Sequence, residues 1–172
     1  MRNFFIFGLP RSRTAWLANL FNTEKVKCYH LASVAGDIKK LFGKSKKEYV
    51  GMSEPNPHFY PAAKEAFPEA PIVVIQRGAV ESFEAYAEKF SRQIDQELFN
   101  FFMQEQEWLD KIKEDSNAIT FGYEDLDVEA IWQHLVPEVP FDKERADYLE
   151  EFNVQTMIQT DDDLKGYLGR IQ

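Results

Sequence analysis

The sequence is poor in the residues that build disulfides and metal centres. Its 172 residues include one cysteine, Cys28, and three histidines, His30, His58 and His134. A lone cysteine excludes an internal disulfide and a cysteine-rich zinc site, and the three histidines lack metal-ligand spacing. We therefore expect no bound metal. Such sparing use of cysteine is typical of a reducing compartment, which predicts a cytoplasmic protein.

Long apolar runs are also missing. The longest are four to six residues, against the roughly 20 that a membrane-spanning helix needs, so we expect no membrane partner. Apolar residues still make up 44% of the chain and aromatic residues 15%, which is enough for a buried core and argues against wholesale disorder. The length is that of one domain, and the sequence has no repeat, low-complexity segment or linker. We predict a single domain over residues 1–172.

Positive charge is scarce overall and unevenly placed. The formal net charge is −9. Residues 1–50 hold ten Lys and Arg against three Asp and Glu, whereas residues 51–172 hold ten against 26. An acidic protein repels phosphate through its own field, which argues against nucleic acid as a partner. The basic first third can still contain a local anion site.

Short apolar runs and helical stripes alternate along the chain. The runs predict strands at residues 4–7, 26–29, 49–52, 71–75 and 118–121. The stripes predict helices near residues 14–21, 31–42, 61–66, 79–90, 94–112, 127–135 and 142–152. This alternation predicts an α/β fold, a three-layer α/β/α sandwich with a central, mainly parallel sheet. The apolar stripe on 94–112 is wide enough for a helix–helix contact, so both a monomer and a homodimer stay open.

The segment after the first apolar run is the most informative in the chain. It reads Gly-Leu-Pro-Arg-Ser-Arg-Thr-Ala over residues 8–15, where a parallel sheet presents its carboxyl edge to ligands. The start of the following helix offers free backbone N–H groups to an anion. Arg11 and Arg13 add charged donors, and the Ser12 and Thr14 hydroxyls can complete the site. The segment therefore predicts an anion site of the phosphate type.

The same segment departs from the loop that binds nucleoside triphosphates. That loop reads G-x-x-x-x-G-K-[ST]. When the motif is aligned on Gly8, Arg13 stands at its second glycine, Thr14 at its lysine and Ala15 at its Ser or Thr. The second glycine and the lysine are therefore missing. The pattern disfavours an ATPase or GTPase and leaves a divergent P-loop-type kinase as an alternative.

The segment resembles the 5′-phosphosulfate-binding loop of sulfotransferases, Gly-x-Pro-(Arg/Lys)-Ser-Gly-Thr followed by Thr or Ser and then Trp and Leu. The matching residues are Gly8, Pro10, Arg11, Ser12, Thr14, Trp16 and Leu17. Arg13 replaces the usual glycine, and Ala15 replaces a hydroxyl residue. The phrase as a whole looks like a group of short phage-associated or bacterial sulfotransferase-like proteins. The resemblance implies a P-loop-NTPase-like sulfotransferase fold, and 3′-phosphoadenosine 5′-phosphosulfate (PAPS) as the sulfuryl donor, without a metal.

Two later segments add weaker support. The strand at 71–75 is followed by Arg77, which the resemblance assigns to the 3′-phosphate of the donor, although a surface ion pair with Glu81 or Glu84 explains it as well. Residues 132–155 resemble the tail of the same short group. With these segments the resemblance spans most of the chain, but only the first loop is specific.

The serine that sulfotransferases place eight residues after this arginine is absent. Ala85 stands there, and Ser82 and Ser91 are the available substitutes.

The resemblance also assigns roles in the reaction. The donor-binding residues would be Pro10, Arg11, Ser12, Arg13, Thr14, Ala15, Arg77 and Ser82, with Arg11 also stabilising the sulfuryl oxygens. The base in the superfamily is a His or Glu after an early strand. His30 is the first candidate, Glu54 the second and His58 the third. The acceptor would be a hydroxyl or amine of a small molecule. A nucleotide-binding module on the same fold that has lost turnover remains a further alternative.

Overall fold

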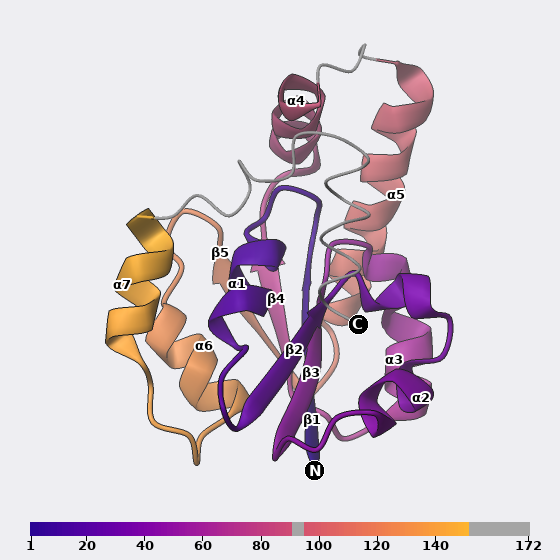
Figure 1. Cartoon of the computed structure of the whole chain (residues 1–172). Coiled ribbons are helices and arrows are strands. Elements are labelled where there is room, and N and C mark those ends of the chain that lie inside the picture. Colours follow the sequence, from indigo (N-terminus) through magenta and orange to yellow (C-terminus); the bar gives the residue numbers. More distant parts are fainter. Residues whose placement is uncertain (91–94, 152–172) are drawn as a thin grey trace.

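The centre of the molecule is a sheet of five parallel strands. The computed structural model describes residues 1–90 and 95–151. The strands, each at its predicted place, are β1 (Arg2–Gly8), β2 (Val26–His30), β3 (Tyr49–Glu54), β4 (Ile72–Gln76) and β5 (Ala118–Gly122). Their order across the sheet is β2-β3-β1-β4-β5 (Figure 1). The prediction of a parallel sheet is therefore confirmed, and β1 lies at its centre.

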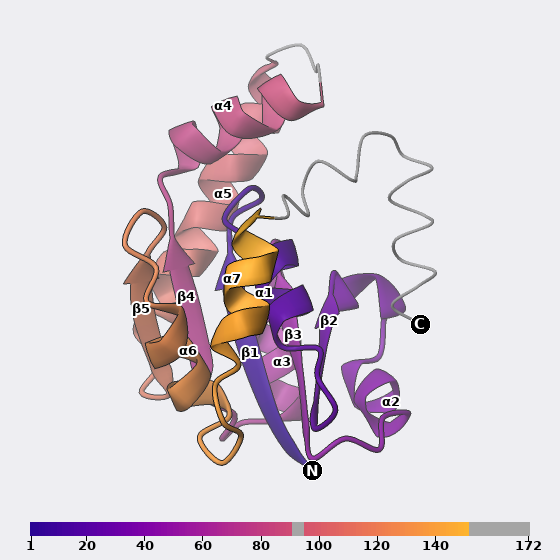
Figure 2. The same cartoon turned by 60° about the vertical axis from the view of Figure 1, so that its left-hand side comes forward.

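Helices cover both faces of this sheet (Figures 1 and 2). One face carries α1 (Thr14–Leu20), α6 (Val128–Leu135) and α7 (Lys143–Glu151), and the other carries α2 (Ile38–Gly43), α3 (Tyr60–Ala66), α4 (Ala79–Lys89) and α5 (Gln96–Ile112). These layers confirm the α/β/α sandwich. None of the helices in the described ranges is both long enough and apolar enough to cross a bilayer.

The apolar run of β1 serves both layers. Phe4 and Ile6 belong to the core beneath α1, α6 and α7, whereas Phe5 and Phe7 belong to the core on the opposite face. All four are buried. A strand covered on both faces has no need of the polar alternation seen in half-exposed strands, which explains the unbroken run of the sequence.

The helix predicted over residues 31–42 is in fact two short elements. A 3-10 helix, η1 (Ala32–Ala35), ends at Gly36, whose φ is 74°. The α2 helix then begins after Asp37, whose side chain accepts a hydrogen bond from the Lys40 N–H at 2.9 Å. A glycine in the left-handed region followed by an aspartate N-cap ends one helix and starts another, and the apolar periodicity alone does not reveal this.

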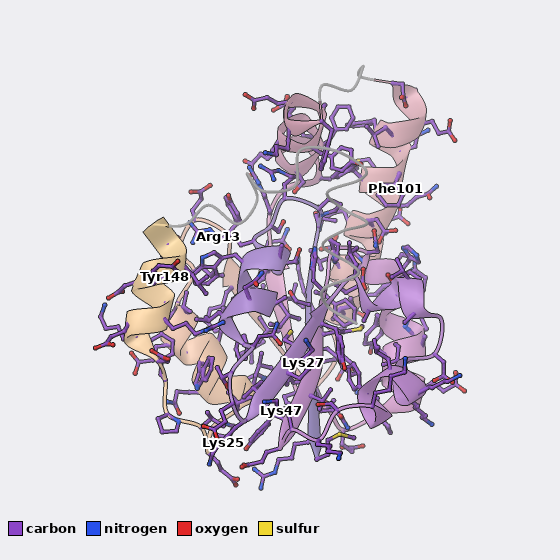
Figure 3. The ribbon with its side chains drawn as sticks, in the orientation of Figure 1. Arg13, Lys25, Lys27, Lys47, Phe101 and Tyr148 are labelled. Atoms are coloured by element: carbon purple, nitrogen blue, oxygen red, sulfur yellow. The ribbon has the colours of Figure 1, made fainter. Side chains whose placement is uncertain are left out.

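Much of the positive charge of the first third lies at one edge of the sheet. Figure 3 shows Lys25, Lys27 and Lys47 together near β2, which is an edge strand. Lys25 lies 3.6 Å from the Glu48 carboxylate, and the Lys27 ammonium lies 5.0 Å from the centre of the Tyr29 ring. Lysines on an edge strand discourage pairing with another chain. Lys27 is the one of the three that lies on the edge strand itself, and the arginines of the β1–α1 segment lie elsewhere.

Gly51 in β3 is required by close packing, which gives a first prediction. A methyl group at this position would lie 2.5 Å from the ring of Phe4, which is fully buried and would have to shift within the packed core. Gly51→Ala should lower the free energy of unfolding by about 1–3 kcal/mol, measured by urea denaturation.

Gly43→Ala is the matched control, because a methyl group there meets nothing within 4 Å. It should be neutral or stabilising, as helix propensity favours alanine. Equal stability of the Gly51 variant and the wild type would contradict the packing of β1 against β3.

Candidate active site

The candidate site lies where the connections of the sheet diverge. After β1 the chain enters α1 on one face, and after β4 it enters α4, whose Ala79 and Phe83 join the core of the opposite face. β1 and β4 are direct neighbours. Open α/β sheets bind ligands at the carboxyl ends of two neighbouring strands whose helices leave on opposite faces. Arg11 follows β1 and Arg77 follows β4, so both predicted anion-binding arginines lie at this edge of the sheet.

The β1–α1 segment is a tight turn followed by a second unusual backbone position. The Ser12 N–H donates to the Leu9 carbonyl at 3.1 Å, with Pro10 and Arg11 as the central residues of the turn. Arg11 has φ of 71°, as the third residue of a type II turn requires, and Arg13 has φ of 60°. Glycine is the residue that adopts this region without strain. Arg13 stands where the loop that this segment resembles carries a glycine, and its backbone lies in the region that favours glycine.

Backbone strain concentrates at the same edge of the sheet. Among the described residues, the non-glycine positions with positive φ are Arg11, Arg13 and Leu31. The first two follow β1 and the third follows β2 directly. Each such position costs on the order of 1–3 kcal/mol, and they cluster at sites that bind ligands.

The structure brings Arg13 and Arg77 to one aromatic ring, that of Tyr123, and joins Arg77 to the backbone of Arg11. Arg77 donates a hydrogen bond from Nη1 to the Arg11 carbonyl, and its guanidinium carbon lies 4.2 Å from the centre of the Tyr123 ring. The Arg13 guanidinium lies 5.7 Å from the same ring and forms a 2.9 Å ion pair with Glu150. Arg77 thus binds the β1–α1 segment, and among the described contacts it forms no ion pair with the glutamates of α4.

Arg11 and Arg77 have no directly paired carboxylate among the described residues, although the charge of Glu88 acts on Arg11 from farther away. In the part of the chain that the structure describes, neither side chain forms an ion pair, and the Nε atom of each is buried without a hydrogen-bond partner. Burial lowers the pKa of Arg11, and the neighbouring charge of Arg77 lowers this pKa as well. Two cations close together at a half-buried site favour the binding of an anion.

Buried hydroxyl groups lie in the segments that end at this edge. The side chains of Ser12, Ser53 and Ser82 are fully buried, and each Oγ lacks a hydrogen-bond partner. Ser82 is the substitute proposed for the missing serine, whereas Ser91 lies outside the described residues. A buried hydroxyl without a partner is costly, so its presence is consistent with a polar ligand.

The rest of the predicted donor-binding segment is mostly covered. Thr14 and Ala15 are buried at the start of α1, and Pro10 is partly exposed. Because α1 has only seven residues, we assign the attraction for an anion chiefly to the arginines rather than to the helix dipole.

His30, the first candidate for the base, is buried at the end of β2. Its Nδ1 lies 3.0 Å from the Ser53 carbonyl oxygen, and burial lowers the pKa of the ring to about 4. The imidazole is therefore neutral at neutral pH. Ser53 is its direct neighbour in the register of β2 and β3, so the two side chains lie on the same face of the sheet.

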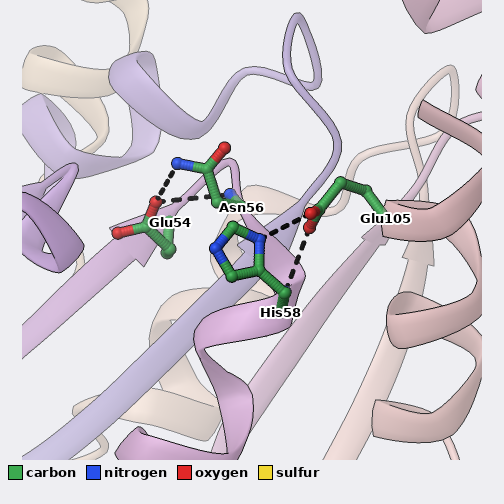
Figure 4. A network of polar contacts seen from close by, with 4 residues as sticks. All are labelled: Glu54, Asn56, His58 and Glu105. Atoms are coloured by element: carbon green, nitrogen blue, oxygen red, sulfur yellow. Dashed lines mark hydrogen bonds and ion pairs between the residues drawn. The ribbon is translucent and has the colours of Figure 1, made fainter. Parts of the chain in front are cut away.

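Glu54, the second candidate, lies on the opposite face and is fully buried. Its Oε2 accepts the Ser33 N–H at 3.0 Å, and its Oε1 accepts the side-chain amide of Asn56 at 2.9 Å (Figure 4). Burial raises the pKa of this carboxyl, while these hydrogen bonds lower it. Glu54 thus links the chain after β2 to the chain after β3.

His58, the third candidate, pairs with a glutamate that the sequence reasoning does not find. Its Nδ1 lies 2.5 Å from Oε1 of Glu105 on α5, and its backbone N–H donates to Oε2 at 3.0 Å. Glu105 is 3% exposed and shares the buried face of α5 with Phe102 and Leu109. A charged residue at an apolar position of this stripe is the signal that could have identified it. Within the described ranges, no group of three or more His, Cys, Asp or Glu side chains is placed to hold a metal ion.

The comparisons with known proteins show the fold and not the activity. No family model matches the chain, and no curated protein sequence matches it. Among solved structures, the chain is similar to a gluconokinase from Sinorhizobium meliloti 1021, with a TM-score of 0.51 and 10% sequence identity over 90% of this chain and 97% of that one. The five-stranded parallel sheet with its flanking helices is therefore similar to a P-loop kinase fold. The likeness supports the fold that the resemblance implied, without singling out sulfotransferases.

The burial of His30 predicts a specific pH dependence of stability. Because the pKa of His30 is about 4 in the folded protein against an ordinary 6.5, the unfolded chain binds more protons in this interval. Stability must then fall as the pH drops through it. Relative to about pH 7.5, this residue should cost about 2 kcal/mol at about pH 5.

His30→Gln removes the titrating group and should reduce that loss. Urea denaturation of both proteins at the two pH values measures it, since the contributions of carboxylates cancel in the comparison. An identical pH dependence in the variant and the wild type would refute the buried neutral imidazole.

Proposed function

We propose that this protein is a nucleotide-dependent group transferase that moves a sulfuryl group from PAPS to a hydroxyl or amine of a small acceptor. The observation that carries the proposal is the pair Arg11 and Arg77, two partly buried arginines without an ion-pair partner in the described structure, at the carboxyl ends of β1 and β4. A donor with phosphates at both ends of its ribose offers an anion to each arginine. The resemblance of residues 8–17 to the phosphosulfate loop favours this donor over others.

Sulfuryl transfer suits a site that offers charge and position rather than a covalent nucleophile. The reaction is an in-line displacement in which negative charge collects on peripheral oxygens and on the leaving phosphate. Fixed cationic donors stabilise that charge without having to reorganise. In this proposal Arg11 contacts the transferred group, the backbone and hydroxyls of residues 12–15 bind the 5′-phosphate, and Arg77 with Ser82 binds the 3′-phosphate.

A second candidate function is phosphoryl transfer from ATP by a divergent P-loop-type kinase. The likeness to a gluconokinase favours it and gives it more support than it gives to sulfuryl transfer. Against it, Thr14 and Ala15 occupy the positions of the P-loop lysine and hydroxyl residue. Sulfuryl transfer and phosphoryl transfer would both use Arg11 and Arg77 at the carboxyl ends of β1 and β4, and they differ in the donor.

The proposal extends to partners and location. The acidic remainder of the chain would repel a bulky polyanionic acceptor, so a small neutral or cationic acceptor fits the field better. We infer a cytoplasmic protein without nucleic-acid or membrane partners.

Calorimetric titration separates the candidates. The wild type should bind adenosine 3′,5′-bisphosphate, the product of PAPS, more tightly than ATP with Mg²⁺. The reverse order would favour the kinase, and binding of neither would refute a nucleotide-dependent enzyme. Binding of the bisphosphate without turnover of PAPS in the presence of any small alcohol, phenol or amine would favour the binding module.

The arginine pair gives a mutational prediction. Arg11→Ala and Arg77→Ala should each weaken binding of the bisphosphate about ten- to a hundredfold, because each removes a charged hydrogen bond worth about 1.5–3 kcal/mol. Arg2→Ala is the matched control. Its guanidinium lies at the opposite edge of the sheet in an exposed ion pair with Glu138, and its loss should leave the affinity unchanged. Wild-type affinity in both site variants would place the donor elsewhere.

A further inference from the structure

Arg13 and Glu150 form an ion pair that joins the β1–α1 segment to the last turn of α7. Nη1 of Arg13 lies 2.9 Å from Oε1 of Glu150, and the two residues are 137 positions apart in the chain. Arg13 directly precedes α1, and Figure 3 shows it beside this end of α7. Among the described contacts, Glu150 has no other partner. The pair therefore brings a carboxylate of α7 to the segment that is predicted to bind an anion.

The cation that Glu150 occupies lies close to the other arginines of the site. The Arg13 guanidinium carbon lies 5.7 Å from the centre of the Tyr123 ring, and that of Arg77 lies 4.2 Å from the same centre. The two guanidinium carbons can therefore be no farther apart than the sum of these distances. Arg77 in turn donates to the Arg11 carbonyl. A negative charge on Arg13 thus lies near the two arginines to which we assign the donor.

The backbone at Arg13 indicates that its side chain has a use beyond this ion pair. Arg13 has φ of 60°, a region in which glycine is unstrained and other residues are not. The side chains of Arg13 and Glu150 are 35% and 49% exposed. A half-exposed ion pair changes an equilibrium only about two- to fivefold, which is less than the cost of a strained backbone position. The ion pair alone therefore does not account for an arginine here.

We propose that Glu150 is an autoinhibitory counter-ion, which occupies Arg13 in the free protein and is displaced by the anionic 5′ end of the donor. This inference rests on the proposed function, in which residues 12–15 bind the 5′-phosphate. A guanidinium binds phosphate and carboxylate through the same planar set of N–H donors, so the two anions compete for Arg13. The phosphosulfate carries more negative charge than one carboxylate, which favours the exchange.

Displacement of Glu150 loosens the last turn of α7 without releasing the helix. The Trp16 indole N–H donates to the Leu149 carbonyl at 2.9 Å, and Arg145 donates to the Leu20 carbonyl at 3.1 Å. Neither contact involves the side chains of the ion pair. The helix therefore stays on α1 when the pair breaks, and the Trp16 indole, bonded to the residue before Glu150, reports on the change.

Calorimetric titration with adenosine 3′,5′-bisphosphate measures the competition. Glu150→Gln keeps the size of the side chain and removes its charge, so it should bind the bisphosphate about two- to fivefold more tightly than the wild type. Glu144→Gln is the matched control, because it makes the same change of net charge on the first turn of α7, where Glu144 has no described ion pair. The control should bind as the wild type does. If the wild type prefers ATP with Mg²⁺, the same comparison is made with ATP.

Arg13→Ala separates competition from a general effect of charge. In this background Glu150 has no cation to occupy, so Glu150→Gln should no longer tighten binding. Tighter binding that persists in the double variant would overturn the proposal. Weaker binding by Glu150→Gln alone would also overturn it, because Glu150 would then position Arg13 for the donor rather than compete with the donor.

Hydrogen exchange of the Trp16 indole N–H tests the displacement itself. Trp16→Phe identifies its signal among those of the three tryptophans. Saturation with the bisphosphate should speed this exchange about two- to fivefold in the wild type, because the last turn of α7 then opens more often. Free Glu150→Gln should already exchange at the faster rate, and the bisphosphate should not raise it further. Unchanged or slower exchange in the saturated wild type would contradict the displacement.

The outcomes separate this inference from the proposed function. A wild type that binds neither the bisphosphate nor ATP refutes the proposed function, and with it the competition at Arg13. A wild type that binds one of them, with the same affinity as Glu150→Gln, refutes the autoinhibitory role alone.

Discussion

The parallel pairing of β1 with two strands at once is the constraint on which the rest of this structure depends. β3 lies on one side of β1 and β4 on the other, and the apolar side chains of β1 fill both cores. This register brings the ends of three strands to one edge, so that Arg11, Glu54 and Arg77 follow neighbouring strands although the sequence separates them widely. The contact between Arg77 and the Arg11 carbonyl is a consequence of that register.

The positive charge at this edge shows how an acidic protein could attract the anion that we propose. The net charge of −9 gives a repulsive field at a distance. At the carboxyl ends of β1 and β4 the balance differs, because the guanidinium groups of Arg13 and Arg77 lie on Tyr123 and, of these two, only that of Arg13 has a described carboxylate partner, Glu150. The strained backbone of the segment and its buried serine hydroxyl are consistent with the proposed ligand.

The sequence was sufficient for the layers of the fold. An unbroken apolar run such as that of β1 is typical of a strand covered on both faces, so the sequence alone predicts its burial. The break at Gly36 was missed because a positive φ at one residue leaves no trace in apolar periodicity. The fold itself is confirmed, whereas the donor, the acceptor and the roles of the site residues stay predictions.

The pairing of His58 with Glu105 could not be derived from the sequence. It depends on how α5 packs against the chain after β3, and no local spacing encodes a contact between distant segments. The stacking of Arg77 on Tyr123 has the same origin. The sequence does contain a glutamate at a position of the apolar stripe of α5. A charged side chain buried there needs a polar partner from another segment.

The attachment of α7 to α1 has a consequence for the order in which the molecule is completed. The Trp16 indole N–H donates to the Leu149 carbonyl, 133 residues later, and Arg145 donates to the Leu20 carbonyl at the end of α1. Arg13 meets Glu150 in the same region. A chain emerging from the ribosome makes the β1–α1 segment 133 residues before the Leu149 carbonyl that holds it in place. The segment therefore assumes its final form only after α7 has been synthesised.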